Sequence, residues 1–297
     1  MDELWTNLGP EVINISYTGS RSIIHRVIQI DFSSISAFLT GFSTYPQPLR
    51  LRLRIFTIFF LYKQTHQAVR KGELSTIMKL VFDKADLVKS VGIAMKAVSG
   101  KTTMPILECI LIDASSNVIK FTSNDMELGI ETIVTGMILE RGIVALDAKI
   151  FSEIVRKLPD NQVTIETDEN LVTTITCEKA KFNIPGQSGE DFSYLPILET
   201  SDCVSISQFT LKELIRQTIF SIAANENNKL MTGELFEIKD NTLRVVSLDG
   251  HRIAIRRIEL KDSYPDRKVV VPGKTLNEIS KILSGEMDDQ IDIYFSE

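Results

Sequence analysis

The sequence predicts an α+β chain in which repeated domains each pack two helices on antiparallel sheets. Two observations lead to this fold class. Three blocks of sequence recur in the same order along the chain, and within each copy amphipathic helical stretches alternate with short apolar runs typical of strands.

The recurring blocks define the repeat. Their offsets are 127, 124 and 125 residues, for residues 82–91 with 209–218, 117–125 with 241–249, and 149–158 with 274–283. Three blocks at nearly one offset indicate a duplicated domain.

Each copy follows one plan of elements. The first helix is expected over 83–98 and 210–223, and the second over 147–158 and 273–284. Turn residues at 115–117 and 239–241 favour hairpins between strands. The strand-like runs are 106–113, 118–122, 128–135, 163–167, 171–177 and 181–184 in the first copy, and 233–239, 243–247, 253–260 and 290–295 in the second.

The domain boundaries follow from the repeats. We expect one domain over 78–203 and a second over 204–297. The second copy ends before the counterparts of 171–177 and 181–184, so we expect it to be incomplete at its C-terminus.

Residues 1–77 differ from the rest. They carry a net charge of +3 against −9 for the remainder, and they show no sustained period of 2 or 3.6. We expect a disordered extension, or upstream sequence read in frame with Met78 as the natural start; a regulatory domain is the remaining alternative. The apolar run 55–62 is too short to cross a bilayer, so no membrane protein is expected.

The composition excludes several classes of function. A net charge of −6 argues against a protein that coats nucleic acid through bulk positive charge. The three cysteines (Cys109, Cys177, Cys203) form no CxxC pair, and only three histidines occur, so we expect no disulfide framework, metal or cofactor. A reducing cytoplasm is the expected compartment.

Basic residues recur on the polar faces of the four predicted helices. A single pair of this kind usually marks a solvated face, but its recurrence at repeat-equivalent places favours loose contact with phosphates. The pairs are Lys89 and Lys96, Lys149 and Arg156, Lys212 and Arg216, and Lys274 and Lys281.

Signs of catalysis are sparse. Phosphate-loop, serine-hydrolase and zinc-protease motifs do not occur in the sequence. Asp249, His251 and Arg252 could form an acid–base site of a DNA-acting enzyme, but the equivalent stretch of the first repeat keeps only Asp125, which favours a shared turn.

Several motifs together resemble the bacterial sliding clamp family, the beta subunit of DNA polymerase III. The resemblance covers residues 78–297 and rests on Lys101–Leu107, Thr122–Glu127, Phe220–Ala223, Thr232–Glu237, Leu248–Ala254 and Val269–Pro272. It implies the DNA-clamp fold, with three domains per chain and two chains closed head to tail around double-stranded DNA. By that measure the third domain is absent from this chain.

The resemblance also implies roles for individual residues. Lys101, Lys149 and Lys274 match DNA-contacting positions. A groove for the clamp-binding peptides of the replicative polymerase and the clamp loader is implied at Met231, Leu248, Gly250, His251, Arg252 and Ile253. The implied function is a non-catalytic processivity factor that tethers the polymerase without reading sequence. A nonfunctional clamp fragment is the alternative.

Overall fold

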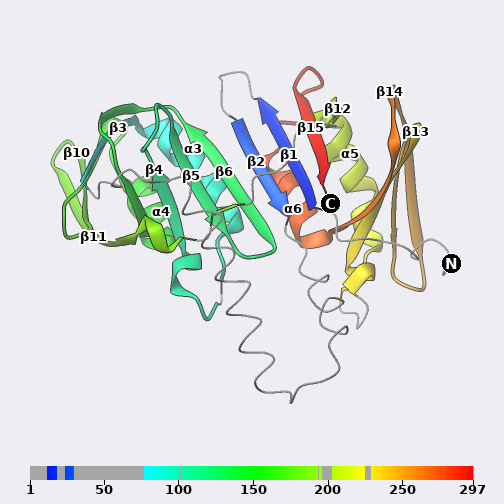
Figure 1. The fold of residues 1–297 in the computed structure, drawn as a ribbon, viewed down its shortest axis with the longest axis horizontal. Coiled ribbons are helices and arrows are strands. Elements are labelled where there is room, and N and C mark those ends of the chain that lie inside the picture. Colours follow the sequence, from blue (N-terminus) through cyan, green and yellow to red (C-terminus); the bar gives the residue numbers. More distant parts are fainter. Residues whose placement is uncertain are drawn as a thin grey trace, which may run out of the picture.

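The computed structural model describes residues 77–100, 102–192, 194–195, 203–224 and 229–296, together with the backbones of two strands at 12–18 and 24–29. Two copies of one domain plan lie next to each other, and helices and antiparallel sheets pack together in both (Figure 1). The predicted α+β class and the repeat are therefore confirmed.

The first repeat begins at Met78 and contains two α-helices. Its elements are β3 (Met78–Asp83), α3 (Lys84–Ala94), the 3₁₀ helices η2 (Met95–Ala97) and η3 (Pro105–Glu108), β4 (Cys109–Asp113), β5 (Ile119–Asn124), β6 (Leu128–Val134), β7 (Met137–Glu140), β8 (Ile143–Asp147), α4 (Ala148–Lys157), β9 (Gln162–Thr167), β10 (Val172–Cys177), β11 (Ala180–Ser188) and η4 (Gly189–Asp191).

The second repeat keeps the same general order of strand, helix, 3₁₀ helices, strands, helix and strand, and ends after the strand that follows its second α-helix. Its elements are β12 (Cys203–Ser207), α5 (Gln208–Thr218), the 3₁₀ helices η5 (Ile219–Ser221) and η6 (Lys229–Thr232), β13 (Gly233–Leu248), β14 (Ile253–Pro272), α6 (Gly273–Ile282) and β15 (Gln290–Ser296). The first helix of each repeat is shorter than expected, because its last turn tightens into a 3₁₀ helix at η2 and η5.

Side-chain caps fix where three of the helices begin. The carboxylates of Asp83 and Asp147 accept hydrogen bonds from the amides of Ala85 (2.9 Å) and Ile150 (2.8 Å). Ser207 caps α5 in the same way. Asp83 and Ser207 are 124 residues apart, so the offset of 127 assigned to the first sequence block is wrong by three residues: Phe82 lies in a strand, whereas Phe209 lies in a helix.

The register of the strands repeats as well. Cys109 pairs with Asp147 and Asn124 with Gly129 in the first copy. The equivalent pairs in the β13–β14 hairpin are Gly233 with Pro272 and Leu248 with Ile253. The duplicated plan therefore extends to individual backbone pairs.

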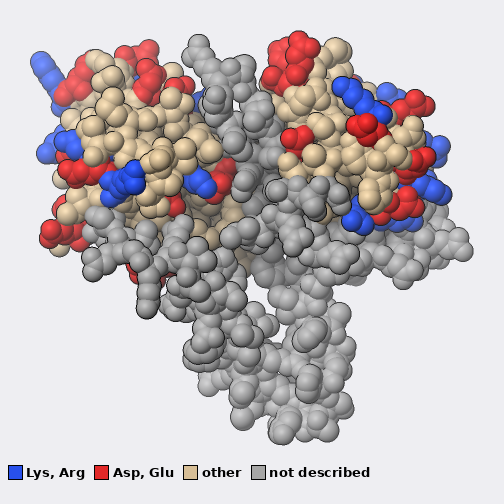
Figure 2. Space-filling view, turned by 45° about the horizontal axis from the view of Figure 1, so that its top comes forward, with Lys and Arg blue, Asp and Glu red and all other residues tan. Residues whose placement is uncertain are grey.

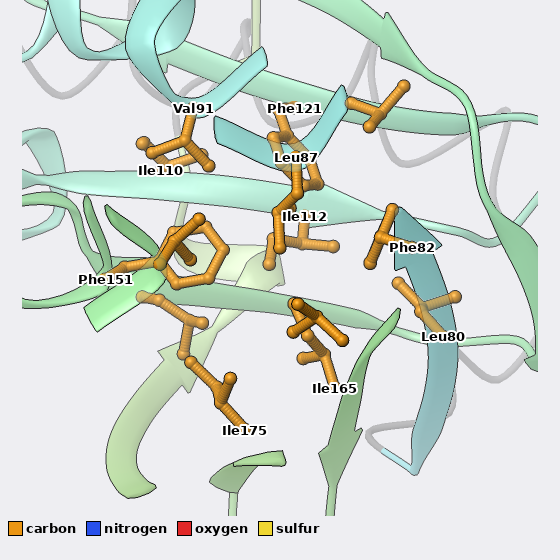
Figure 3. Packing of buried hydrophobic residues seen from close by; sticks show 14 of the residues in the cluster. Leu80, Phe82, Leu87, Val91, Ile110, Ile112, Phe121, Phe151, Ile165 and Ile175 are labelled. Atoms are coloured by element: carbon orange, nitrogen blue, oxygen red, sulfur yellow. The ribbon is translucent and has the colours of Figure 1, made fainter. Parts of the chain in front are cut away.

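Aromatic rings organise the core of the first repeat. Phe121 lies between Phe82 and Phe151, with ring centroids 6.0 and 6.1 Å apart in edge-to-face geometry (Figure 3). All three side chains are fully buried, and they come from β3 (Phe82), β5 (Phe121) and α4 (Phe151).

A second apolar cluster crosses from one repeat to the other. Ile93 and Ala97 of the first repeat, with Leu128 and Ile130 of β6, belong to the same cluster as the core of the second repeat. This shared burial holds the two repeats together.

Residues 1–77 do contain regular structure, contrary to the expectation of a wholly disordered extension. β1 (Val12–Thr18) and β2 (Ile24–Gln29) pair with each other and lie between β15 and β6 (Figure 1). They complete a 13-stranded sheet in the order β12-β15-β1-β2-β6-β5-β4-β8-β11-β10-β9-β3-β7. The apolar run 55–62 lies outside the described residues.

Candidate nucleic-acid interface

Three of the predicted phosphate-contacting residues are exposed on the helices of the first repeat and form no ion pair with a described residue. Lys89 lies on α3, and Lys149 and Arg156 lie on α4, which packs beside α3. The Arg156 guanidinium donates a hydrogen bond to the carbonyl oxygen of Ser152 at 3.3 Å. None of the three has a carboxylate within 4 Å in the described part of the chain, so their charges are open to an anionic ligand.

The basic residues of α5 are already occupied. The Nζ atom of Lys212 donates to the carbonyl oxygen of Leu283 at 3.0 Å, which links α5 to the end of α6. Arg216 donates two hydrogen bonds to the Glu213 carboxylate, at 2.8 and 2.7 Å. These bonds lower the pKa of Glu213 to about 2. Arg216 thus carries its own counter-ion.

Two basic residues near α6 join the two repeats, and a third is paired within α6. Lys274 forms an ion pair with Asp125, whose side chain is only 4% exposed. Lys96 of η2 pairs with Glu278 at 3.5 Å, and Lys281 pairs with the same carboxylate at 2.6 Å. Two of the predicted DNA contacts, Lys96 and Lys274, therefore lie at the junction between repeats.

The pKa of Lys274 reflects its ion pair with Asp125. Burial acts against the charged form, but the hydrogen bond and the charge of Asp125 outweigh it and raise the pKa of Lys274. Asp125 also accepts hydrogen bonds from the amides of Glu127 and Leu128. Sequence reasoning treated Asp125 only as part of a turn; its position 149 residues before Lys274 gave no local signal of the contact.

The remaining predicted contact, Lys101, lies outside the described residues. On the face that Figure 2 shows, acidic and basic side chains are interspersed over both repeats. Lys89, Lys149 and Arg156 are therefore a small group of unneutralised cations on a surface that otherwise mixes both charges.

Most of the residues predicted to line the peptide groove lie at the turn from β13 to β14. Leu248 is buried at the end of β13, and its backbone pairs with Ile253, whose side chain is 49% exposed. Gly250 has φ +86°, a left-handed conformation that the turn requires. The half-buried Met231 lies on η6, which packs against both strands, and its carbonyl oxygen accepts a hydrogen bond from the amide of Ala223 at 2.9 Å.

One further apolar residue extends this surface. Ile255 is two residues after Ile253 on β14 and is equally exposed, while Ala254 between them is buried. Residues two apart on a strand share a face, so Ile253 and Ile255 form one exposed apolar strip. The two large residues on either side of a small one could have indicated the strip. Large apolar residues at alternate positions of a strand are normally expected to face the core, however, so the sequence offered no reason to place them outside.

Asp249, His251 and Arg252 form a turn and not a catalytic site. The Asp249 carboxylate accepts hydrogen bonds from the amides of His251 (3.0 Å) and Arg252 (3.1 Å) and from the Arg252 guanidinium (2.8 Å). These contacts lower the pKa of Asp249, which makes it a poor general base. The same turn geometry surrounds Asp125 in the first repeat.

Two other kinds of site have no counterpart among the described residues. Within those residues, no three His, Cys, Asp or Glu side chains gather as metal ligands. None of their helices has the length and apolar character needed to span a membrane.

Comparison with protein families gives two matches in tandem. The model of the N-terminal domain of the DNA polymerase III beta subunit matches residues 78–196, and that of its central domain matches residues 205–297. Residues 1–77 lie outside both.

Individual relatives agree. The chain is 36% identical over 231 residues to the beta sliding clamp of Halalkalibacterium halodurans and 37% identical over 230 residues to that of Bacillus subtilis. Each alignment covers 74% of this chain and 60% of the relative, so the chain spans about 60% of the length of these relatives.

Solved structures are similar as well. A structure from Eubacterium rectale assigned as a DNA polymerase III beta subunit has 67% identity and a TM-score of 0.72, and covers 74% of this chain and 62% of its own. The sliding clamp from Bacillus subtilis has 34% identity and a TM-score of 0.70, with 74% and 64% covered.

Proposed function

Because the chain belongs to the DNA polymerase III beta subunit family, we propose that it serves as part of a sliding clamp, a non-catalytic processivity factor that holds double-stranded DNA without reading its sequence. Its division into a first clamp domain at 78–203 and a second at 204–297 is part of this proposal. So is its place in the bacterial cytoplasm, where replication occurs.

One observation carries the DNA-contacting role. Lys89, Lys149 and Arg156 present three exposed cations on adjacent helices of a chain whose net charge is −6, and no described carboxylate neutralises them. Long, flexible cations on a helical surface contact phosphates as mobile charges. Such contacts give affinity without fixing a register, which sliding requires.

Lys274 and Lys96 have a different role in this proposal. Their ion pairs with Asp125 and Glu278 set the angle between the two repeats, and so orient the helices that carry the free cations. Lys274 is 60% exposed and keeps donors for a phosphate as well.

The partners are proposed on the same basis. The exposed strip at Ile253, beside Met231 and the Leu248–Arg252 turn, suits an extended peptide with apolar anchors from the replicative polymerase or the clamp loader. Head-to-tail pairing of two chains around DNA is proposed for the full-length family and is not extended to this chain.

The DNA-contacting role is tested with a charge reversal. Lys149→Glu should weaken binding to a short DNA duplex about tenfold at low salt and reduce the salt slope by about 0.9 for each phosphate that is no longer neutralised. Lys261→Glu, an exposed position on β14, is the matched control. Fluorescence anisotropy over a salt series measures both. Equal weakening in the two variants, or none in Lys149→Glu, would refute the assignment.

A further inference from the structure

Beside β15, the N-terminal hairpin takes the place that β10 and β11 take beside β9 in the first repeat. The outer partners differ, because β11 pairs with β8 of its own repeat and β2 pairs with β6 of the other repeat. In the first repeat, β9 lies between β3 and β10, and β10 pairs onward with β11. In the second, β15 lies between β12 and β1, and β1 pairs onward with β2. All of these pairings are antiparallel.

The correspondence extends to the register. Ile165 of β9 lies opposite Leu80 on one side and Ile175 on the other. Ile293 of β15 lies opposite Val204 and Ile15. Ile15 therefore holds the register position of Ile175, although it comes from the opposite end of the chain.

The second strand of the hairpin joins the two repeats. Val27 of β2 lies opposite Ile15 on one side and Ile130 of β6 on the other. In the described part of the chain, β6 and β15 have no other strand on these sides. Figure 1 shows the two blue strands filling the space between them. The hairpin thus covers two edges whose N–H and C=O groups would otherwise lack sheet partners.

We propose that β1 and β2 extend the sheet of the second repeat by strand addition within the same chain and couple it to the first repeat. Strand addition depends mainly on backbone hydrogen bonds. The segment lies outside the residues matched by the clamp family, so this role is a property of this chain and does not depend on the proposed DNA-binding function.

Hydrogen–deuterium exchange on the full chain tests the role of β1. Because β1 lies between two strands, a proline within it removes a ladder hydrogen bond whichever neighbour the amide faces. Ile15→Pro should make the amides of β15 exchange about tenfold faster, while those of β4 in the first repeat stay protected. Ile15→Val, which keeps the amide, is the matched control and should leave exchange unchanged.

A second variant tests the coupling of the repeats. Val27→Pro in β2 should accelerate exchange in β6 in the same way. Unchanged exchange in β15 and β6 in both proline variants would overturn the proposal. If the amides of the whole chain exchange faster in a variant, a synthetic peptide of residues 12–29 is added to it. Restored protection of the β15 amides supports the proposal. Failure of the peptide to restore this protection overturns it.

Protein concentration distinguishes the source of the hairpin. Protection of β15 in the unmodified chain should be the same at low and high concentration, because the hairpin is supplied within one chain. Protection that falls on dilution would mean that a second copy supplies it, and would overturn complementation in cis.

Discussion

At the scale of single residues, the structure separates cations that are free from cations that are paired. Sequence spacing alone treated Lys149 and Lys274 as equivalents, and both are exposed on the second helix of their repeat. Only Lys274 meets a carboxylate, because Asp125 reaches it from the other repeat. Amphipathic periodicity predicts which face a side chain occupies, but it contains no information about which distant residue faces it.

A buried carboxyl group should make stability depend on pH. Glu234 is fully buried on β13 without a hydrogen-bond or charged partner for its carboxylate among the described residues, and this burial raises its pKa to about 7. The native state then holds a proton that the unfolded chain releases near pH 4.5. This contribution is fully present below pH 4.5 and is lost as pH rises through 7.

Replacing the group tests this dependence. From pH 5 to pH 8, the free energy of unfolding should fall less in Glu234→Gln than in the unmodified chain. The difference between the two decreases should be up to about 3 kcal/mol. Urea unfolding at the two pH values measures the difference. Glu259→Gln, an exposed position on β14, should behave like the unmodified chain. The same pH dependence in Glu234→Gln as in the unmodified chain would contradict this prediction.

At the scale of elements, the duplicated plan preserves a buried hydrogen bond between strand and helix. The Ser123 hydroxyl of β5 donates to the carbonyl oxygen of Ala94 at 2.6 Å, and the Ser247 hydroxyl donates to that of Thr218 at the same distance. Each bond satisfies a carbonyl in the last turn of the first helix of its repeat. Sequence comparison aligned the two serines, but the role of their hydroxyls required the structure.

These equivalent bonds should have equivalent energies. Ser123→Ala and Ser247→Ala should each lower the free energy of unfolding by about 1–3 kcal/mol, because each leaves a buried carbonyl without its donor. Ser205→Ala, at an exposed position on β12, should change it little. Thermal unfolding of the three variants provides the comparison, and a decrease confined to one repeat would show that the two sites are not equivalent.

The exposed apolar strip of Ile253 and Ile255 on β14 leads to a prediction about peptide binding. Ile253→Asp should abolish most binding of an extended peptide with apolar anchors, since a charge would replace part of the apolar surface that the peptide buries. Met137→Asp places the same charge on an exposed apolar position of β7 in the other repeat, and should leave binding intact. Isothermal titration calorimetry separates the two results; equal weakening in both variants would place the peptide elsewhere.

At the scale of the whole molecule, the sequence predicted the repeat, its α+β class and its four α-helices, but not the strands β7, β8 and β12. It did not predict β1 and β2. These two strands pair with each other, but their outer partners, β15 and β6, lie far along the chain, and the short alternation of Ile13, Ile15 and Tyr17 with polar residues was not recognised as a strand. It also did not predict the apolar cluster shared by the repeats, in which Ile93 and Ala97 contact a core formed by a later part of the chain. Contacts between distant segments lie beyond local periodicity.

The measurement that tests the clamp assignment most directly is the affinity of the unmodified chain for two DNA duplexes of equal length and unrelated base sequence, over a series of salt concentrations. Phosphate contact through mobile cations predicts the same dissociation constant for both, within about twofold, and a linear fall of log affinity with log salt. A tenfold preference for one duplex, or binding that salt does not weaken, would contradict a sliding clamp.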